Sequence, residues 1–166
     1  MAEQAFDTNL AEAHTALGVV ELTLNWNWSA AEREFKRAIE LNPNYSLAHA
    51  FYAHYLVAMG RLDEAIAEAK RSLELDPFAQ FTVDFNQWAF YLARQYDLTS
   101  QQSKKSLEFA PEFAWAHYDI AMVYQQKGQK ADSIQEFLKA QELFGLSLDR
   151  LAELRKAYQL SGEKGY

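Results

Sequence analysis

The chain has 166 residues and a formal net charge of −7, an acidic balance that argues against a surface for nucleic acid or anionic membranes. The absence of cysteine excludes disulfides, thiolate metal sites and thiol catalysis, and it fits a cytoplasmic protein. No apolar stretch approaches the roughly 18 to 20 residues of a membrane span, and the scarcity of glycine and proline favours long helices.

A spacing of 34 residues recurs along the chain. Pro43, Pro77, Pro111 and Gly145 follow one another at this interval. A fixed period of this size is typical of a stacked array, in which one helical hairpin recurs and buries its face on the next. We therefore expect one domain of four repeats. The predicted repeats span about 9–43, 44–77, 78–111 and 112–145.

Hydrophobic periodicity predicts two amphipathic helices in each repeat. In the fourth repeat, for example, Ile120, Ala121 and Tyr124 share one helical face, and Gly128 permits the turn that follows. A ninth helix, at about 148–160, is expected to close the end of the array with a polar face. The other expected helices span about 9–24, 29–41, 45–59, 62–75, 79–95, 98–109, 112–127 and 129–143.

The first repeat is one residue longer than the others, and the extra residue falls within Asn25–Trp28. One interpretation is a wider turn that the indoles cover, and the other is a protruding aromatic contact for a partner. Directly after this insertion, Ser29 and Glu32 form a capping-box pattern. The pattern predicts that the second helix begins at Ser29.

The third repeat keeps the period but has polar residues where the others have small or bulky apolar ones. Asn86 and Gln87 replace apolar and small residues in its first helix, and Thr99, Ser103 and Ser106 do so in its second. Hydroxyls can bond to the carbonyl four residues earlier, so we expect the helix to form. Its core should be less densely packed. We therefore predict that this repeat is the softest joint of the array, which means that it opens locally more readily than the others.

Small and bulky residues recur at fixed places in the other hairpins, and they resemble the tetratricopeptide repeat. The resemblance covers nearly the whole chain. It implies an all-α fold, a right-handed α-solenoid of four helical hairpins plus a C-terminal capping helix. It also implies a non-catalytic scaffold for protein–protein interaction. The matching residues are Leu17-Gly18, Ala31, Phe35, Ala38 and Pro43 in the first repeat, and Ala121, Tyr124, Phe137 and Ala140 in the fourth.

In tetratricopeptide arrays the first helix of each repeat lines a concave groove. Carried over to this chain, the resemblance implies an aromatic, weakly acidic groove that is richest over the third and fourth repeats. The groove lacks the lysine, asparagine and arginine with which chaperone-tail-binding members grip a terminal carboxylate, so an apolar or helical peptide suits it better. The candidate partner-binding residues are His54, Phe81, Asp84, Trp88, Tyr91, Trp115, Tyr118 and Met122.

A competing interpretation places some of these aromatic residues in the core. Asn86 and Gln87 fall on the supposed core face of their helix, and a rolled helix would remove this conflict. Apolar residues would then replace them in the core. The residues that would point inward are Phe81, Phe85, Trp88 and Leu92.

No cluster of residues in the sequence indicates catalysis, a cofactor or a metal ion. His14, His49 and His117 occupy equivalent positions in three repeats, so they lie about a repeat apart, too far to bind one ion. The chain lacks a glycine-rich phosphate loop, a His-Glu-x-x-His motif and a serine nucleophile in an elbow. We therefore predict that it is not an enzyme and uses neither a cofactor nor a metal.

The predicted function is the binding of a protein or peptide, as the interaction or sensory part of a larger bacterial regulator. Both ends of the chain and the Trp26-Asn27-Trp28 turn resemble the tetratricopeptide segment of bacterial multidomain regulators, so we expect a fragment of a longer chain. The alternative is a small-molecule sensor, in which the array closes around an effector and signals to an attached module. A third hypothesis is self-association through an apolar face of the truncated N-terminal repeat.

Overall fold

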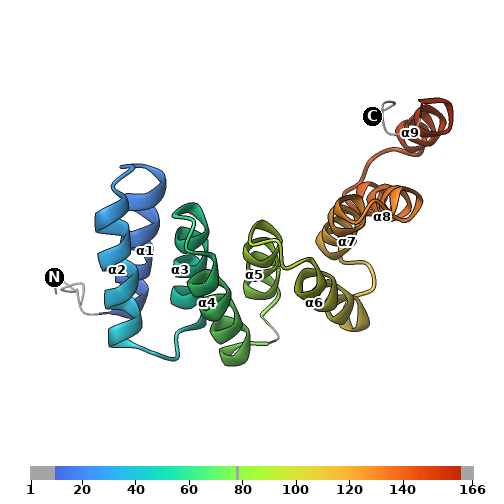
Figure 1. Cartoon of the computed structure of the whole chain (residues 1–166). Helices are drawn as coiled ribbons and strands as arrows, with labels where there is room; N and C mark the ends of the chain where they lie inside the picture. The colour runs from blue at the N-terminus through green and yellow to red at the C-terminus, as the bar shows by residue number, and fades with distance from the viewer. Residues whose placement is uncertain (1–9, 78, 162–166) are drawn as a thin grey trace, which may run out of the picture. The chain divides into compact units, whose positions relative to one another are not determined.

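The computed structural model describes residues 10–77 and 79–161, and within these ranges all regular secondary structure is helical (Figure 1). Every helix expected from the sequence is present, with ends that differ from the prediction by a few residues at most. The helices are α1 (Ala11–Thr23), α2 (Trp28–Leu41), α3 (Ser46–Ala58), α4 (Leu62–Leu75), α5 (Gln80–Leu92), α6 (Tyr96–Phe109), α7 (Ala114–Gln126), α8 (Lys130–Leu143) and α9 (Leu148–Ser161).

The chain forms two compact units, Met1–Ala93 and Arg94–Tyr166, which divide inside the third repeat. In the first unit, α1 and α2 form one hairpin, α3 and α4 form the next, and α5 packs on both α3 and α4. In the second unit, α6 packs on α7, α7 and α8 form a hairpin, and α9 packs on α8. The all-α class is confirmed, and three of the helical hairpins predicted from the period are present: α1–α2, α3–α4 and α7–α8.

Phe35 lies at the centre of the first unit's core and is fully buried. Its ring contacts the rings of Tyr52 and Tyr55 on α3, with centroid distances of 6.2 and 6.1 Å. Gly18 of α1 makes room for the ring, because a Cβ at this position would lie 2.6 Å from Cε1 of Phe35. The two helices of the hairpin therefore touch at a small residue, and a bulky ring fills the space beside it.

The turn between the two helices of each repeat contains one residue with a positive φ, and these residues follow one another at intervals of 34. They are Trp26 (53°), Gly60 (72°), Arg94 (59°) and Gly128 (71°). Glycine adopts this conformation without a steric cost, whereas another residue pays about 1–2 kcal/mol. Because Trp26 keeps the 34-residue interval to Gly60, the extra residue of the first repeat precedes Trp26.

The start of α2 differs from the capping-box prediction, which is wrong. Asn27 is the N-cap, and its side chain accepts a hydrogen bond of 3.2 Å from a backbone N–H of the first turn. Ser29 lies inside the helix and donates its hydroxyl hydrogen to Asn27. Glu32 binds Lys36 and Arg61 at 2.9 and 2.6 Å instead, and hydrogen bonds from these two cations lower its pKa to about 2.

The first helix of the third repeat is not rolled. Asn86 and Gln87 are fully buried, and Leu92 at the end of the same helix is exposed, so the interpretation that put Leu92 in the core is wrong. Nδ2 of Asn86 donates to Oγ of Ser72 and to the carbonyl oxygen of Thr82, both at 2.9 Å. These bonds satisfy the N–H donors of the amide, whereas its Oδ1 is buried without a hydrogen-bond partner among the described residues.

Candidate partner-binding surface

Four of the predicted site residues lie on α3 and α5 in the first unit, and we call them the α5 patch: His54, Asp84, Trp88 and Tyr91. All four side chains are half-buried. The rings of Trp88 and Tyr91 meet edge to face, with centroids 5.9 Å apart. Phe81 belongs to the same helix, but its side chain lies outside the part of the chain that the structure describes.

His54 fixes α3 to α5. Its Nε2 donates to the backbone oxygen of Phe85 at 2.6 Å, and its ring stacks on the Phe85 ring with centroids 3.6 Å apart. The Phe51 ring covers Phe85 from α3, at a centroid distance of 4.9 Å. Burial lowers the pKa of His54, and the hydrogen bond to Phe85 opposes this effect. His54 therefore serves as a structural contact between the two helices.

Asp84 is the acidic member of the α5 patch. Its Oδ1 is buried, and the described part of the chain offers it no hydrogen-bond partner. Burial raises the pKa of this carboxyl group from 3.8 to about 6, because the charged form loses hydration without gaining a donor. A half-buried carboxylate in this state can accept a hydrogen bond or an ion pair from a bound molecule.

The other three predicted site residues lie on α7 in the second unit, and we call them the α7 patch: Trp115, Tyr118 and Met122. Trp115 is 44% exposed, but neighbouring rings hold its indole on two sides. Its centroid lies 5.9 Å from that of Tyr118 and 4.9 Å from that of Phe144, in edge-to-face contacts. An aromatic surface held in this way presents a large contact area at low entropic cost to a partner.

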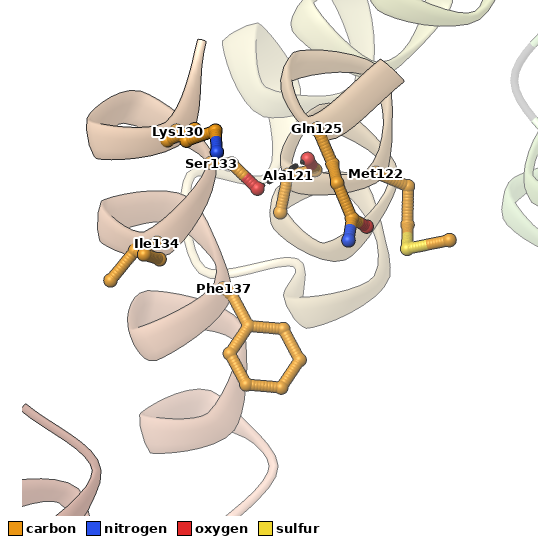
Figure 2. Close-up of a pocket in the computed structure, with 7 residues that line it drawn as sticks. All are labelled: Ala121, Met122, Gln125, Lys130, Ser133, Ile134 and Phe137. Atoms are coloured by element: carbon orange, nitrogen blue, oxygen red, sulfur yellow. Dashed lines mark hydrogen bonds between the residues drawn. The ribbon is translucent and has the colours of Figure 1, made fainter. Parts of the chain in front are cut away.

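Met122 also lines an open pocket between α7 and α8, with a volume of about 210 Å³ (Figure 2). Ala121 and Gln125 contribute from α7, and the other lining residues come from α8. The pocket is mainly apolar, and its wall on the α8 side is formed by Lys130, Ser133, Ile134 and Phe137. The sequence analysis missed this pocket, although Phe137 and Ala121 belong to the repeat pattern.

The histidines at equivalent positions pair with glutamates of the second helix in their own hairpins. Nδ1 of His14 lies 2.5 Å from Glu34, and the corresponding distance is 2.5 Å for His49 and Glu68. The fourth repeat has the same pair, at 2.6 Å from His117. Among the described residues, no group of three potential ligands could hold a metal ion. The pairs therefore join helices, as equivalent structural contacts.

The indoles of Trp26 and Trp28 meet edge to face at 6.1 Å, and both are exposed. They form a small aromatic projection at the turn of the first hairpin.

Within the described ranges, every helix is too short or too polar to cross a bilayer.

Two family models described as tetratricopeptide repeat match the chain, at residues 27–81 and 116–144. Together they cover about half of its length. The first match covers α2, α3, α4 and the start of α5, and the second covers most of α7 and all of α8, including Tyr118 and Met122. A search of curated proteins gave no match.

Solved structures of similar fold share about a fifth of their residues with this chain, a level that shows the fold and nothing more. A structure described as pilF of Pseudomonas aeruginosa has 21% identity and a TM-score of 0.74, over 93% of this chain and 69% of that one. PilW, described as a widely conserved type IV pilus biogenesis factor, has 20% identity and a TM-score of 0.74, over 96% and 74%. MamA has 19% identity and a TM-score of 0.68, over 82% and 80%. The α-solenoid fold class is thereby confirmed, and the chain belongs to the tetratricopeptide repeat family.

Proposed function

We propose that this chain is a non-catalytic protein–protein interaction scaffold, which binds a peptide or partner segment through the aromatic surface expected as a concave groove. Its membership of the tetratricopeptide family supports the general class. The main support for partner binding through this aromatic surface is the α7 patch, where Trp115 is exposed and yet held by Tyr118 and Phe144. A fixed, exposed tryptophan is a typical anchor for a partner.

The α5 patch indicates the chemistry of the partner. Trp88 and Tyr91 offer apolar and aromatic area, whereas Asp84 offers a carboxylate whose Oδ1 lacks a donor. A segment with apolar side chains and one N–H donor or basic group would satisfy both features. We therefore expect an apolar peptide that carries a basic residue, and binding should strengthen as Asp84 ionises.

The pocket size favours this function over a small-molecule sensor. The α7–α8 pocket has about 210 Å³, below the roughly 300–1,000 Å³ of typical ligand sites. It is also open, so a small molecule would leave much of its surface in water. A side chain of a bound segment fits such a pocket better.

We place the scaffold in the cytoplasm, as the interaction or sensory part of a larger bacterial regulator. The net charge of −7 supports a protein partner in preference to nucleic acid or an anionic membrane. The four repeats at 9–43, 44–77, 78–111 and 112–145 would act as one interaction domain. Self-association through the first repeat is part of the proposal, and its structural basis is developed below.

The test is affinity capture of proteins from the source cell's lysate, followed by titration of the captured partner against variants. Trp115→Ala/Tyr118→Ala removes both aromatic residues of the α7 patch, and Asp84→Asn/Trp88→Ala changes two of the four residues of the α5 patch. Phe109→Ala is the matched control, because Phe109 is an exposed aromatic residue on α6 outside both patches. Circular dichroism would confirm that each variant remains helical.

We expect each double variant to weaken binding of the captured partner at least tenfold, with no change for the Phe109 control. Equal binding by all four proteins would contradict the proposed surface. A capture without any protein, together with a metabolite retained by the native chain, would favour the sensor.

A further inference from the structure

The contact between the first two hairpins shows how one repeat receives the next. Tyr52 and Tyr55 of α3 pack on the Phe35 ring of α2. Their hydroxyl groups donate to the Glu32 carboxylate at 3.2 and 3.4 Å. The receiving side of this interface is thus a ring and a carboxylate on the second helix of the hairpin, and the inserted side is a pair of side chains on the following first helix.

The hairpin α7–α8 has the receiving side of the same interface, but in the structure it is open. Phe137 and Ile134 lie three 34-residue periods after Phe35 and Glu32, and both line the pocket (Figure 2). Phe35 is fully buried, whereas Phe137 is half-buried. The main contact of α9 is with α8, whereas α3 packs on both helices of the hairpin before it. The pocket is therefore a receiving position without its helix.

The first helix, α1, has the inserted side of the interface, and it too is exposed. Leu17 and Val20 lie 35 residues before Tyr52 and Tyr55, which is one period plus the inserted residue. They are 49% and 38% exposed. The equivalent residues of the three later repeats are no more than 5% exposed. These residues are Tyr52, Tyr55, Asn86, Ala89, Ile120 and Val123.

The two exposed sides match each other chemically. Where Tyr52 and Tyr55 meet the Glu32 carboxylate through their hydroxyls, Leu17 and Val20 would meet Ile134. A polar contact inside the chain thus corresponds to an apolar contact between its two exposed faces.

The charged residues of the two faces also favour this contact. Helix α1 carries Glu12 and Glu21 and has neither lysine nor arginine. The lining of the pocket includes Lys130 and no carboxylate. We propose that α1 of a second copy of this chain docks in the α7–α8 pocket, in the position of a following repeat's first helix, so that copies associate head to tail.

A head-to-tail contact joins two different surfaces, so a dimer still has one free α1 and one free pocket. Association should therefore continue beyond the dimer as the concentration rises. This inference goes beyond partner binding by the two patches, because Leu17, Val20 and Ile134 belong to neither of them. Met122 is shared, since it belongs to the α7 patch and also lines the pocket.

The test uses sedimentation velocity and light scattering on the 166-residue chain across a wide concentration range. Leu17→Glu disables α1 and leaves the pocket intact, whereas Ile134→Glu disables the pocket and leaves α1 intact. Leu24→Glu is the matched control: its equivalent residue, Met59, is exposed, so this position lies outside the repeat contact. If Ile134→Glu loses helicity, Gln125→Trp fills the pocket from an exposed position on α7.

We expect the native chain and the Leu24 control to exceed twice the monomer mass of 19.1 kDa, and each disabled variant to remain monomeric. An equimolar mixture of Leu17→Glu and Ile134→Glu should form a dimer of about 38 kDa and stop there, because one intact α1 then meets one intact pocket. A native chain that is monomeric throughout, or a mixture that does not restore the dimer, would overturn the proposal. Association that survives Ile134→Glu but not Leu17→Glu would also overturn it and indicate pairing of two α1 helices.

Discussion

At Gly18, α1 and α2 approach so closely that any side chain would collide with a buried ring. A Cβ would lie 2.6 Å from Cε1 and 2.7 Å from Cδ1 of Phe35. Alanine gains about 1 kcal/mol of helix propensity over glycine, but overpacking of a core costs about 1–3 kcal/mol. We expect Gly18→Ala to lower the free energy of unfolding by about 1 kcal/mol, measured by urea denaturation.

The Phe35→Leu background provides the control for this prediction, because leucine is smaller than the ring and can move away. The second repeat supports this choice. At the positions of Gly18 and Phe35 it has Ala53 and Ala69, so an alanine fits on the first helix when no ring lies beside it. In that background Gly18→Ala should have no cost, or should stabilise the chain by up to about 1 kcal/mol. An equal loss in both backgrounds would show that the ring is not the cause.

Asp84 makes the stability of the first unit depend on pH. Its pKa is raised from 3.8 to about 6 by burial, so the folded chain holds this proton more tightly than the unfolded chain. The cost of ionisation is absent below about pH 4, grows between pH 4 and 6, and is complete above that range. Asp84→Asn, which resembles the neutral acid, should be about 1 kcal/mol more stable than the native chain at pH 7.5, allowing for partial exposure, and equal to it near pH 3.5.

Asp97 is the matched control for Asp84, because its environment has the opposite effect. Lys127 lies 2.6 Å away and lowers the pKa of Asp97 through a hydrogen bond. This contribution is present at neutral pH and is lost as the pH falls. Asp97→Asn should therefore give no gain at pH 7.5. A gain for both variants would indicate a general effect of negative charge, which would contradict the role assigned to burial of Asp84.

Three hairpins, α1–α2, α3–α4 and α7–α8, are each joined by a histidine–glutamate pair. The equivalent positions of His49 and Glu68 in the third repeat are Val83 and Gln102. In the second repeat the pair also reaches the repeat boundary, since Nε2 of His49 donates to the carbonyl oxygen of Pro43 at 3.0 Å. The third repeat thus lacks the two residues that form this pair in the other repeats.

The helices could be predicted because their signals are local and repeat every 34 residues. Hydrophobic spacing and turn residues such as Gly60 and Gly128 act within a few positions of the chain. The start of α2 was mispredicted because Asn27 and Ser29 can both cap a helix, and the inserted residue before Trp26 decides between them. A local sequence pattern therefore does not show which of the two residues caps α2.

The candidate site was less predictable, because it depends on contacts between helices. The sequence placed Trp115 on a possible binding face, but its exposure and its support from Phe144 follow from the turn after α8. The lack of a donor at Asp84 depends on every neighbour of α5. The α7–α8 pocket follows from the position of α9, which begins 34 residues after α7 and yet packs on α8. A helical period cannot predict where a final helix will pack.

For the whole molecule, the weakest point is expected where the two units divide, between Ala93 and Arg94. Arg94 has a φ of 59° at the position where the second and fourth repeats have glycine, and this costs about 1–2 kcal/mol. Helix α6, which follows, buries small hydroxyl side chains, Thr99, Ser103 and Ser106. Such side chains bury little apolar area. Both features weaken the same segment.

We therefore expect amide hydrogens of residues 98–109 to exchange on the order of tenfold faster than those of residues 129–143, measured by hydrogen exchange with mass spectrometry. Arg94→Gly should slow exchange in 98–109 by up to about fivefold, because relief of about 1 kcal/mol stabilises the closed turn. Gly128→Arg is the reciprocal control, and it should speed exchange in 129–143 by a similar factor. Slower exchange in 98–109 than in 129–143 would contradict the soft joint. An unchanged rate in Arg94→Gly would mean that α6 opens without its preceding turn, so that the polar packing of Thr99, Ser103 and Ser106 is sufficient to make this helix the first to open.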